Sequence, residues 1–366
     1  MAYTTINDPS EYFHIQLYSG DGNTNRDITN DANSGDFQPD WLWIKNRTDS
    51  STQNFWFNSN VGMPNHLNSD LADVEQTATN KATAFNSDGF RVQDHVQVNG
   101  SGKNYVAWQW KANGGTTTSV SATGTAHEST MAGTHQANTI AGFSIVTFST
   151  ASEDLGDKLI THGIGKKPEW IIIKSRSSGD WYCHHISANT NDSKYIRLNL
   201  TNAPSNAGSR NTFDTSNITT TQFAVDHNNI VNDNHNHVAY VFAPIQGYSK
   251  FGSYTGNGNA DGPFVYLGFK PAWVMVKKTS DAHSWYIQYG STGIDSGDQG
   301  SNPVKSSLQA NSNSADATEN SMDFLSNGFK IRTSGNGHNT DDGTYIYMAF
   351  AERPFVSSKG VPVTAR

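Results

Sequence analysis

The chain has 366 residues, of which 16% are charged and 11% are aromatic, and its formal net charge is -8. This aromatic content argues against a disordered chain, and the lack of any apolar run approaching about 20 residues excludes a membrane span. The basic residues are scattered along an acidic chain, which argues against a nucleic-acid-binding surface.

The first residues carry neither the basic start nor the apolar stretch of a secretion signal. Cys183 is the only cysteine, so an internal disulfide is excluded. We therefore expect a protein made in a reducing cytoplasm without a signal peptide.

Internal repetition is the main organisational signal, because the pattern Pro-x-Trp-x-x-x-Lys occurs three times. Five landmarks recur in the same order in each copy. They are an opening run (Phe13–Tyr18, Phe143–Phe148, Phe251–Tyr254), the Pro-x-Trp segment (Pro39–Lys45, Pro168–Lys174, Pro271–Lys277), a second tryptophan (Trp56, Trp181, Trp285), a short apolar run (Gly89–Val92, Gln222–Val225, Gly328–Ile331) and a closing run (Tyr105–Trp110, His237–Phe242, Tyr345–Phe350).

These short runs are rich in aromatic and β-branched residues and are separated by turn-forming clusters, which is typical of strands. The sequence therefore predicts an all-β protein of three tandem antiparallel jelly-roll (concanavalin-A-like) β-sandwich domains. The predicted organisation is repeat 1 (1–112), a linker (113–140), repeat 2 (141–246) and repeat 3 with a C-terminal tail (247–366). Repeats 2 and 3 join directly, which predicts a rigid pair. Helical spacing occurs only in Leu71–Ala82, which predicts one short helix.

Tryptophans invite a binding interpretation, because an exposed indole stacks on sugar rings. Six of the nine occupy equivalent positions in the repeats, which predicts core packing. Trp43, Trp108 and Trp110 belong to repeat 1 alone. On a strand, Trp41, Trp43 and Lys45 share one face, and the residues between them make the other face apolar as well, so this strand is central in its sheet. We interpret the three extra indoles as a thicker core, as a contact with another chain, or as a glycan contact.

A lysine ends the Pro-x-Trp strand in every repeat, as Lys45, Lys174 and Lys277. This pattern is typical of a charge that extends over the rim of a sheet and blocks edge pairing. The alternative is a contact with an anion or another ligand.

Histidines concentrate in repeat 2, where His235 and His237 alternate and therefore project from one strand face. They are candidates for a partner contact or for a shared metal ion. No Cys partner or His-x-x-x-His helix accompanies them, and His237 takes the place of Tyr105 and Tyr345 in the other repeats. An aromatic packing position is therefore predicted, and no metal site is expected.

The sequence gives little sign of catalysis, since it contains no Gly-x-Ser-x-Gly elbow, no Walker loop and no paired glutamate motif. Cys183 precedes His184 and His185, but adjacent strand residues face opposite ways, so only His185 would share the face of the thiol. We interpret the thiol as buried and inert. We expect no enzyme activity and no cofactor.

Several segments carry a specific resemblance: Met1–Asn7, Phe37–Arg47, Gly247–Gly258, Met348–Phe355 and Thr364–Arg366. Through them the chain resembles, over nearly its whole length, the repeat-containing virion structural proteins of marine tailed bacteriophages such as cyanophages. These proteins are often described as tail-fibre or structural proteins, and their repeats are similar to the concanavalin-A-like jelly roll. The resemblance implies a place in the virion after synthesis in the host cytoplasm, and it carries over no catalytic, metal-binding or sugar-binding residues.

Two functional interpretations stay open. In the first, a tail-fibre-like or appendage component presents lectin-like β-sandwiches to a host-surface polysaccharide. In the second, the protein decorates the capsid or connects virion parts and has no receptor-binding role. Both place it among other virion proteins, as a homo-oligomer in the particle, without nucleic acid or membrane insertion.

Overall fold

The computed structural model describes residues 2–30, 36–125, 128–150, 156–189, 191–207, 212–225, 230–231, 234–290 and 302–362. Over these ranges the protein consists of strands and connecting turns, which confirms the all-β prediction. Its only helices within them are the 3-10 turns η1 (Pro9–Glu11) and η2 (Thr215–Asn217) and the four-residue helix α1 (Asn336–Asn339). No helix in the described part is long and apolar enough to cross a membrane.

Repeat 1 folds into a six-stranded sheet, ordered β1-β9-β3-β4-β5-β6, and a three-stranded sheet, ordered β2-β8-β7. Alternation along β3 explains how they pack, because Leu42 and Ile44 enter the core that also contains Phe90 of the smaller sheet. The strands are β1 (Phe13–Ser19), β2 (Arg26–Ile28), β3 (Trp41–Asn46), β4 (Phe55–Asn58), β5 (Asn65–Asn68), β6 (Gln76–Thr77), β7 (Ala82–Asn86), β8 (Gly89–Val92) and β9 (Asn104–Trp110).

The helix predicted in Leu71–Ala82 is wrong, because this segment is extended and contains β6. Its backbone bonds go to β5 and to repeat 2 instead of along a helix. The amide of Glu75 donates to the carbonyl oxygen of Arg176 at 2.9 Å, and the carbonyl oxygen of Ala72 accepts from the amide of Gly179 at 2.8 Å. Contacts with another repeat therefore override the weak helical spacing.

Repeat 2 contains an eight-stranded sheet, ordered β10-β13-β14-β21-β16-β17-β18-β19, and a four-stranded sheet, ordered β11-β12-β15-β20. Ile171 and Ile173 of the large sheet share a core with Phe223 of the small one. The strands are β10 (Thr118–Val120), β11 (Thr123–Thr125), β12 (Glu128–Thr130), β13 (Gly133–Asn138), β14 (Phe143–Ser149), β15 (Asp157–Thr161), β16 (Trp170–Ser175), β17 (Trp181–His185), β18 (Lys194–Arg197), β19 (Ser205–Asn206), β20 (Gln222–Val225) and β21 (Asn236–Phe242).

The segment predicted to be a linker, 113–140, is built into repeat 2. Strands β13 and β10 extend the large sheet beyond β14, while β12 and β11 extend the small sheet beyond β15. Few large apolar side chains are needed for this, because edge strands gain their backbone hydrogen bonds from a sheet that already exists. Low apolar content therefore did not distinguish an added edge strand from a linker.

Repeat 3 is a single eight-stranded sheet, ordered β22-β29-β24-β25-β26-β27-β28-β23. The sheet curls so that Val274 and Val276 of β24 share a core with Phe329 of β28. The strands are β22 (Ser249–Thr255), β23 (Phe264–Tyr266), β24 (Phe269–Lys278), β25 (Trp285–Tyr289), β26 (Val304–Gln309), β27 (Ala317–Leu325), β28 (Gly328–Ile331) and β29 (Thr344–Pro354).

The same strand order recurs in all three repeats. It is β1-β9-β3-β4 in repeat 1, β14-β21-β16-β17 in repeat 2 and β22-β29-β24-β25 in repeat 3. The opening run, the closing run, the Pro-x-Trp segment and the second tryptophan form these four strands in each case. The predicted landmarks therefore correspond to equivalent strands.

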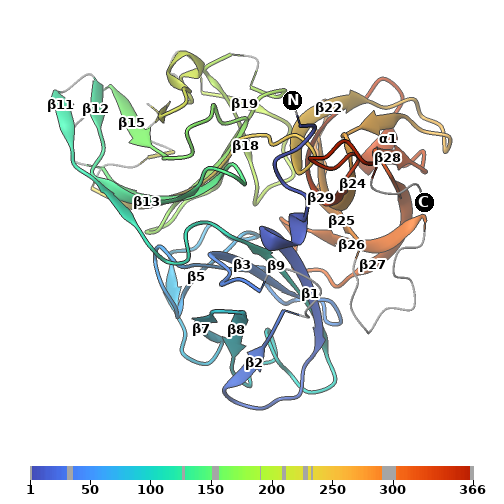
Figure 1. Ribbon diagram of the computed structural model, residues 1–366, viewed down its shortest axis with the longest axis horizontal. Coiled ribbons are helices and arrows are strands. Elements are labelled where there is room, and N and C mark those ends of the chain that lie inside the picture. The colour runs from blue at the N-terminus through green and yellow to red at the C-terminus, as the bar shows by residue number, and fades with distance from the viewer. Residues whose placement is uncertain are drawn as a thin grey trace.

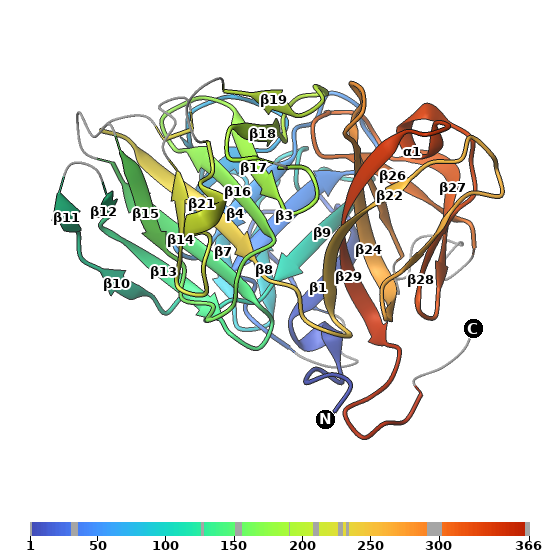
Figure 2. The same cartoon turned by 90° about the horizontal axis from the view of Figure 1, so that it is seen from above.

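The three repeats form three lobes around a common centre (Figure 1), and the large sheets turn one face toward that centre (Figure 2). One buried cluster contains residues from all three large sheets, among them Trp41, Trp170 and Trp273. Repeat 1 is therefore packed as closely as repeats 2 and 3 are, whereas the sequence predicted a rigid pair and a linked third domain.

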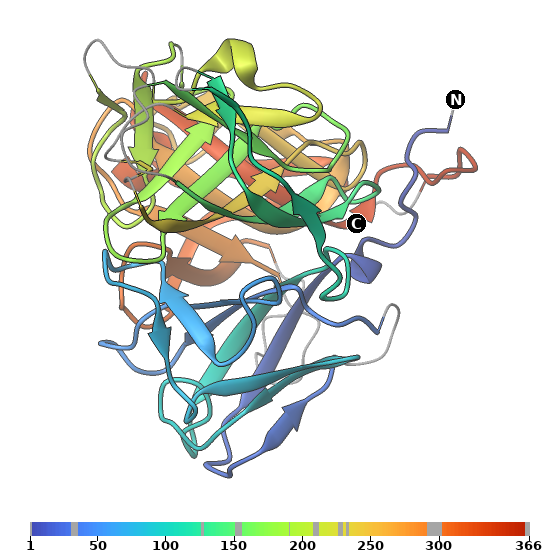
Figure 3. The ribbon, with the colours of Figure 1, turned by 90° about the vertical axis from the view of Figure 1, so that its left-hand side faces the viewer.

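Both ends of the described chain meet on one side of the molecule, where the N-terminal and C-terminal segments project together (Figure 3). A guanidinium nitrogen of Arg353 lies 3.3 Å from Oδ1 of Asp8. The amide of Ser358 donates to Oδ1 of Asn7 at 2.8 Å. The terminal segments are thereby held against repeat 3.

Candidate functional site

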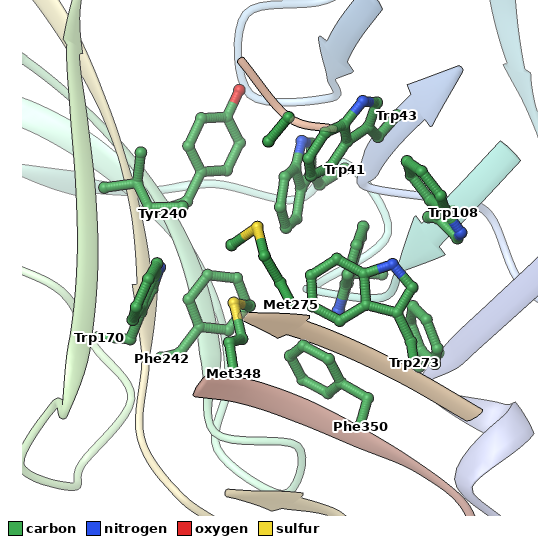
Figure 4. Packing of buried hydrophobic residues seen from close by; sticks show 14 of the residues in the cluster. Trp41, Trp43, Trp108, Trp170, Tyr240, Phe242, Trp273, Met275, Met348 and Phe350 are labelled. Atoms are coloured by element: carbon green, nitrogen blue, oxygen red, sulfur yellow. The ribbon is translucent and has the colours of Figure 1, made fainter. Parts of the chain in front are cut away.

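All nine tryptophans are fully buried, and they lie in the common core between the repeats. Trp41 is near its middle: its ring stacks on Trp110 at a centroid distance of 4.0 Å and packs against Tyr240 of repeat 2 at 4.8 Å. Figure 4 shows Met275 and Trp273 of repeat 3 facing the same space. The aromatic content of the chain is thus used mainly to join the repeats.

Trp43, Trp108 and Trp110 extend this core toward repeat 3 and are at most 1% exposed. Trp108 packs edge-on against Tyr289 at 5.4 Å, and Trp110 packs against Phe350 at 5.6 Å. No indole face is left for a sugar ring or for another chain. The structure supports the thicker-core interpretation of these three residues and not the contact interpretations.

The three repeat-equivalent lysines are also buried, so the predicted extension over a sheet rim is wrong. Nζ of Lys174 donates to the carbonyl oxygen of Asp73 in repeat 1 at 2.9 Å. Nζ of Lys277 donates to the carbonyl oxygen of Thr201 in repeat 2 at 3.1 Å. Each lysine lies one residue before the end of its strand, and at that end the neighbouring repeat covers Lys174 and Lys277.

Lys45 differs from its equivalents because its Nζ donates to the carbonyl oxygen of Thr52 within repeat 1. Burial lowers the pKa of Lys45, Lys174 and Lys277 to about 8 in each case. These ammonium groups are therefore structural donors held in a partly desolvated environment, and no anion is needed to explain them.

Equivalent ion pairs join repeat 2 to repeat 1 and repeat 1 to repeat 3. Arg176 binds the Glu75 carboxylate through two bonds, of 2.8 and 2.7 Å. Nε of Arg47 binds Asp316 at 2.9 Å. In each pair the acidic residue also donates its amide to the carbonyl oxygen of the arginine, at 2.9 Å. The two interfaces use the same chemistry in the same orientation.

Repeat 3 contacts repeat 2 in the same rotational sense, through a tryptophan and a carbonyl oxygen instead of an arginine and a carboxylate. Nε1 of Trp285 donates to the carbonyl oxygen of Arg197 at 3.0 Å. The equivalent Trp181 of repeat 2 donates to the carbonyl oxygen of Asn68 in repeat 1 at 2.9 Å. The repeats therefore follow one another around a closed ring with pseudo-threefold symmetry.

His235 and His237 lie near one another, with ring centroids 6.5 Å apart, as their alternation predicts. His237 is fully buried and stacks on Phe148 at 5.0 Å, which confirms the predicted aromatic packing position. Burial lowers the pKa of His237 to about 3. Among the described residues, no group of three or more His, Cys, Asp or Glu side chains is arranged to hold a metal ion.

Cys183 is buried in the common core, and burial raises the pKa of its thiol well above the usual range. The thiol is therefore kept protonated, as the sequence interpretation expects. His185 is also fully buried, and its Nε2 lies 3.1 Å from the carbonyl oxygen of Tyr347 in repeat 3. Cys183 is therefore a packing residue of the common core, and His185 is one of the interface between repeats 2 and 3.

The exposed aromatic side chains lie elsewhere, on the short strand β23 of repeat 3. Phe264 is 45% exposed and Tyr266 is 48% exposed, while Val265 between them is buried in the core of repeat 3. Nζ of Lys250 donates to the carbonyl oxygen of Tyr266 at 2.7 Å and lies 5.4 Å from the centre of its ring. We call Phe264 and Tyr266 the aromatic platform.

A pocket of about 640 Å³ adjoins the platform where the two terminal segments meet repeat 3. The hydroxyl of Tyr3 links the two features, because it donates to the carbonyl oxygen of Gly268 at 2.8 Å and lies 3.4 Å from the hydroxyl of Tyr266. The pocket is lined by Ala2, Tyr3, Gln246, Ser358, Lys359 and Gly360. It therefore combines an aromatic wall with polar and cationic groups.

Sequence reasoning missed this surface, because it searched for exposed aromatic residues among the tryptophans. A usable signal is present in the repeats themselves. Strand β23 precedes the third Pro-x-Trp segment, and in the other repeats the strand at this place carries no aromatic residue. Comparison of the repeats at that strand singles out Phe264 and Tyr266.

A protein family described as "Domain of unknown function (DUF7483)" matches residues 8–354, and the chain therefore belongs to this family. The matched range spans all three repeats, so the family is defined by the whole ring and not by one repeat. No curated protein matches the chain. No solved structure matches it either.

Proposed function

We propose that this chain, a member of the DUF7483 family, is a non-enzymatic structural protein of a bacteriophage virion. Its three repeats are concanavalin-A-like jelly rolls in this proposal, and the chain serves as a tail-fibre-like or appendage component that attaches to host-surface glycan. The resemblance of its sequence to virion structural proteins of marine tailed phages supports the assignment to the particle.

The observation that carries the proposal is the common core of the three repeats. Buried tryptophans join the repeats, and Lys174, Lys277 and His185 add hydrogen bonds between them. A body of this kind is rigid and keeps its outer loops and edges in a fixed arrangement. This suits a component that holds a binding surface in a fixed position on the particle. Its stability comes from aromatic packing, which salt water does not screen as it screens surface ion pairs.

The test is to locate the chain in purified phage particles by mass spectrometry and cryo-electron microscopy. We expect peptides of this protein in the particles and a three-lobed density at the tail or another appendage. Density on the capsid lattice or between virion parts would favour the alternative, a decorating or connecting protein without a receptor-binding role. Absence of the protein from purified particles would contradict both forms of the proposal.

A further inference from the structure

Comparison of the repeats shows that the aromatic platform is not required by the fold. Strand β23 pairs Val265 with Phe329, β2 pairs Ile28 with Phe90, and β15 pairs Ile160 with Phe223. These pairs define equivalent positions, and each of the inward residues is buried. The fold demands the inward aliphatic residue in all three strands.

The residues on either side of that aliphatic position differ between the repeats. Repeat 1 has Asp27 and Thr29, whereas repeat 3 has Phe264 and Tyr266. Asp27 forms a two-bond ion pair with Arg91, at 2.8 and 2.9 Å, which places charge along that strand. Charged side chains on an edge strand prevent the strand from pairing with another chain.

Repeat 2 has Leu159 and Thr161 at these positions, and its strand is covered. Strand β12 pairs with β15 in parallel register, with Thr130 opposite Leu159. Among the described residues β23 pairs only with β28, and it carries no charged side chain. Two aromatic rings thus remain half-exposed at the one equivalent strand that is neither charged nor covered, which marks a binding surface.

The geometry of the platform fits a chain of sugar rings. Residues two apart on a strand project from one face about 7 Å from each other. Lys250 lies against one side of the Tyr266 ring, which leaves the exposed remainder of that ring for a ligand. The flat face of a pyranose carries C–H groups of partial positive charge, and these pack favourably on the negative face of an aromatic ring.

The adjoining pocket supplies the polar half of a sugar site. Gln246, Ser358 and the exposed Lys359 line it. Its volume of about 640 Å³ lies within the range of ligand pockets. No ion pair within the described residues involves Lys359 (Asp8, at the same end of the molecule, pairs with Arg353). The ammonium group of Lys359 is thus available to a negatively charged substituent.

From these observations we propose that the platform of Phe264 and Tyr266, together with the pocket beside Tyr3, binds an acidic polysaccharide. Pyranose rings stack on the platform, and a carboxylate or sulfate group of the sugar approaches Lys359. This inference rests on the proposed attachment function and assigns it a site and a ligand class. In this inference Phe264 and Tyr266 take the role of glycan contacts that the sequence suggested for Trp43, Trp108 and Trp110.

The test measures binding of the full chain to alginate oligosaccharides, which are chains of uronic-acid pyranoses, by calorimetry and saturation-transfer NMR. Neutral dextran oligosaccharides serve as the comparison. We expect millimolar to micromolar binding of alginate and at least tenfold weaker binding of dextran. The double variant Phe264→Ala/Tyr266→Ala should lose at least tenfold in affinity, whereas Lys359→Gln should weaken alginate binding and leave dextran binding unchanged.

The matched control is Thr29→Ala in repeat 1, which alters the position equivalent to Tyr266, directly after strand β2, where no aromatic platform is present. It should bind like the wild type. No binding of either saccharide, equal binding of both, or an unchanged affinity of the double variant would each overturn the inference. If the double variant binds alginate normally but is missing from particles, the platform is a protein contact and the glycan assignment is wrong.

Failure of this inference is distinguishable from failure of the proposed function, because particle incorporation is measured separately. A chain that is found in particles but binds no glycan leaves the structural function standing. A chain that binds alginate through the platform but is missing from particles leaves the site standing and overturns the virion assignment.

Discussion

Lys174 of repeat 2 reaches across an interface and donates its ammonium hydrogen to the carbonyl oxygen of Asp73 in repeat 1, at 2.9 Å. Lys277 repeats this contact from repeat 3 to repeat 2, with Thr201 as the acceptor. Both side chains are completely buried. Each ammonium group therefore donates to a loop carbonyl oxygen of the neighbouring repeat, and that of Thr201 also accepts from the amide of His283 at 2.8 Å.

The buried lysines predict a specific dependence of stability on alkaline pH. Their pKa values are about 8 in the folded protein, below the usual 10.5. Between these pH values the unfolded chain retains a proton that the folded protein has released, so raising the pH favours folding. For Lys277→Met, we expect the stability of the wild type relative to the variant to grow by about 2 kcal/mol between pH 7.5 and pH 10.

Urea unfolding at several pH values measures this difference, with the exposed Lys359→Met as a control. The absolute stability of every variant falls above pH 10, because burial raises the pKa of several tyrosines, including Tyr240, and their ionisation then favours unfolding. Identical pH slopes for the wild type and Lys277→Met would contradict the prediction.

Buried histidines predict loss of stability in acid. Their folded pKa values lie near 3 or 4, so between pH 6.5 and 4 the unfolded chain binds protons that the folded protein does not. Stability therefore falls as the pH drops through this window, and unfolding takes up protons. The residues are His66, His162, His184, His185, His237 and His338.

The variant His237→Phe separates this effect from general acid damage. Among the described residues neither ring nitrogen of His237 makes a hydrogen bond of good geometry, and the ring stacks on Phe148, so a phenyl ring retains the packing. We expect the variant to lose about 2 kcal/mol less stability than the wild type between pH 7 and pH 5. Thermal unfolding at both pH values tests this. Equal losses would show that His237 is protonated as easily in the folded protein as in the unfolded chain, which would contradict the prediction.

Truncation of Trp41 should weaken the whole ring, because its indole contacts aromatic residues of repeats 1 and 2 at the same time. We expect Trp41→Ala to cost about 3–5 kcal/mol in a single cooperative transition. Val96→Ala, at a half-exposed residue of the same repeat, should change stability by less than about 1 kcal/mol. Guanidinium unfolding followed by near-UV circular dichroism measures both, and separate transitions for the repeats would contradict the shared core.

Removal of repeat 1 should leave the remainder without a closed core. A chain of residues 113–366 would expose the faces of Tyr240, Trp273 and Phe350 that now pack against aromatic residues of repeat 1. We expect this truncated chain to bind the dye ANS and to self-associate, which light scattering would detect. A monodisperse truncated chain with native near-UV circular dichroism would show that the pair of repeats is independent.

Much of the strand structure follows from the sequence, because the repeated landmarks alternate and their turn residues bound them. Alternation also places Leu42 and Trp43 on opposite faces of β3, as observed. Alternation does not tell which partner a face meets. The face of Trp43 packs on another repeat, and that information depends on contacts between residues far apart in the chain.

The same limit explains the errors at the lysines and at the aromatic platform. Lys45, Lys174 and Lys277 lie one residue before the ends of their strands, close to the predicted place, yet a strand end is a rim only if no neighbour covers it. Phe264 and Tyr266 are not singled out by the sequence patterns for the converse reason: their exposure depends on β23 pairing only with β28 among the described residues. Exposure at both places is decided by the arrangement of the repeats.

The ring closes within one polypeptide, and this has a consequence for how its three parts diverge. Three identical subunits would have to change every equivalent position together, and they would separate on dilution. Covalent linkage instead fixes their effective concentration and lets each position vary by itself. Repeat 3 thereby carries an aromatic platform, while the equivalent strand is charged in repeat 1 and covered by another strand in repeat 2. Three identical subunits could not differ in this way.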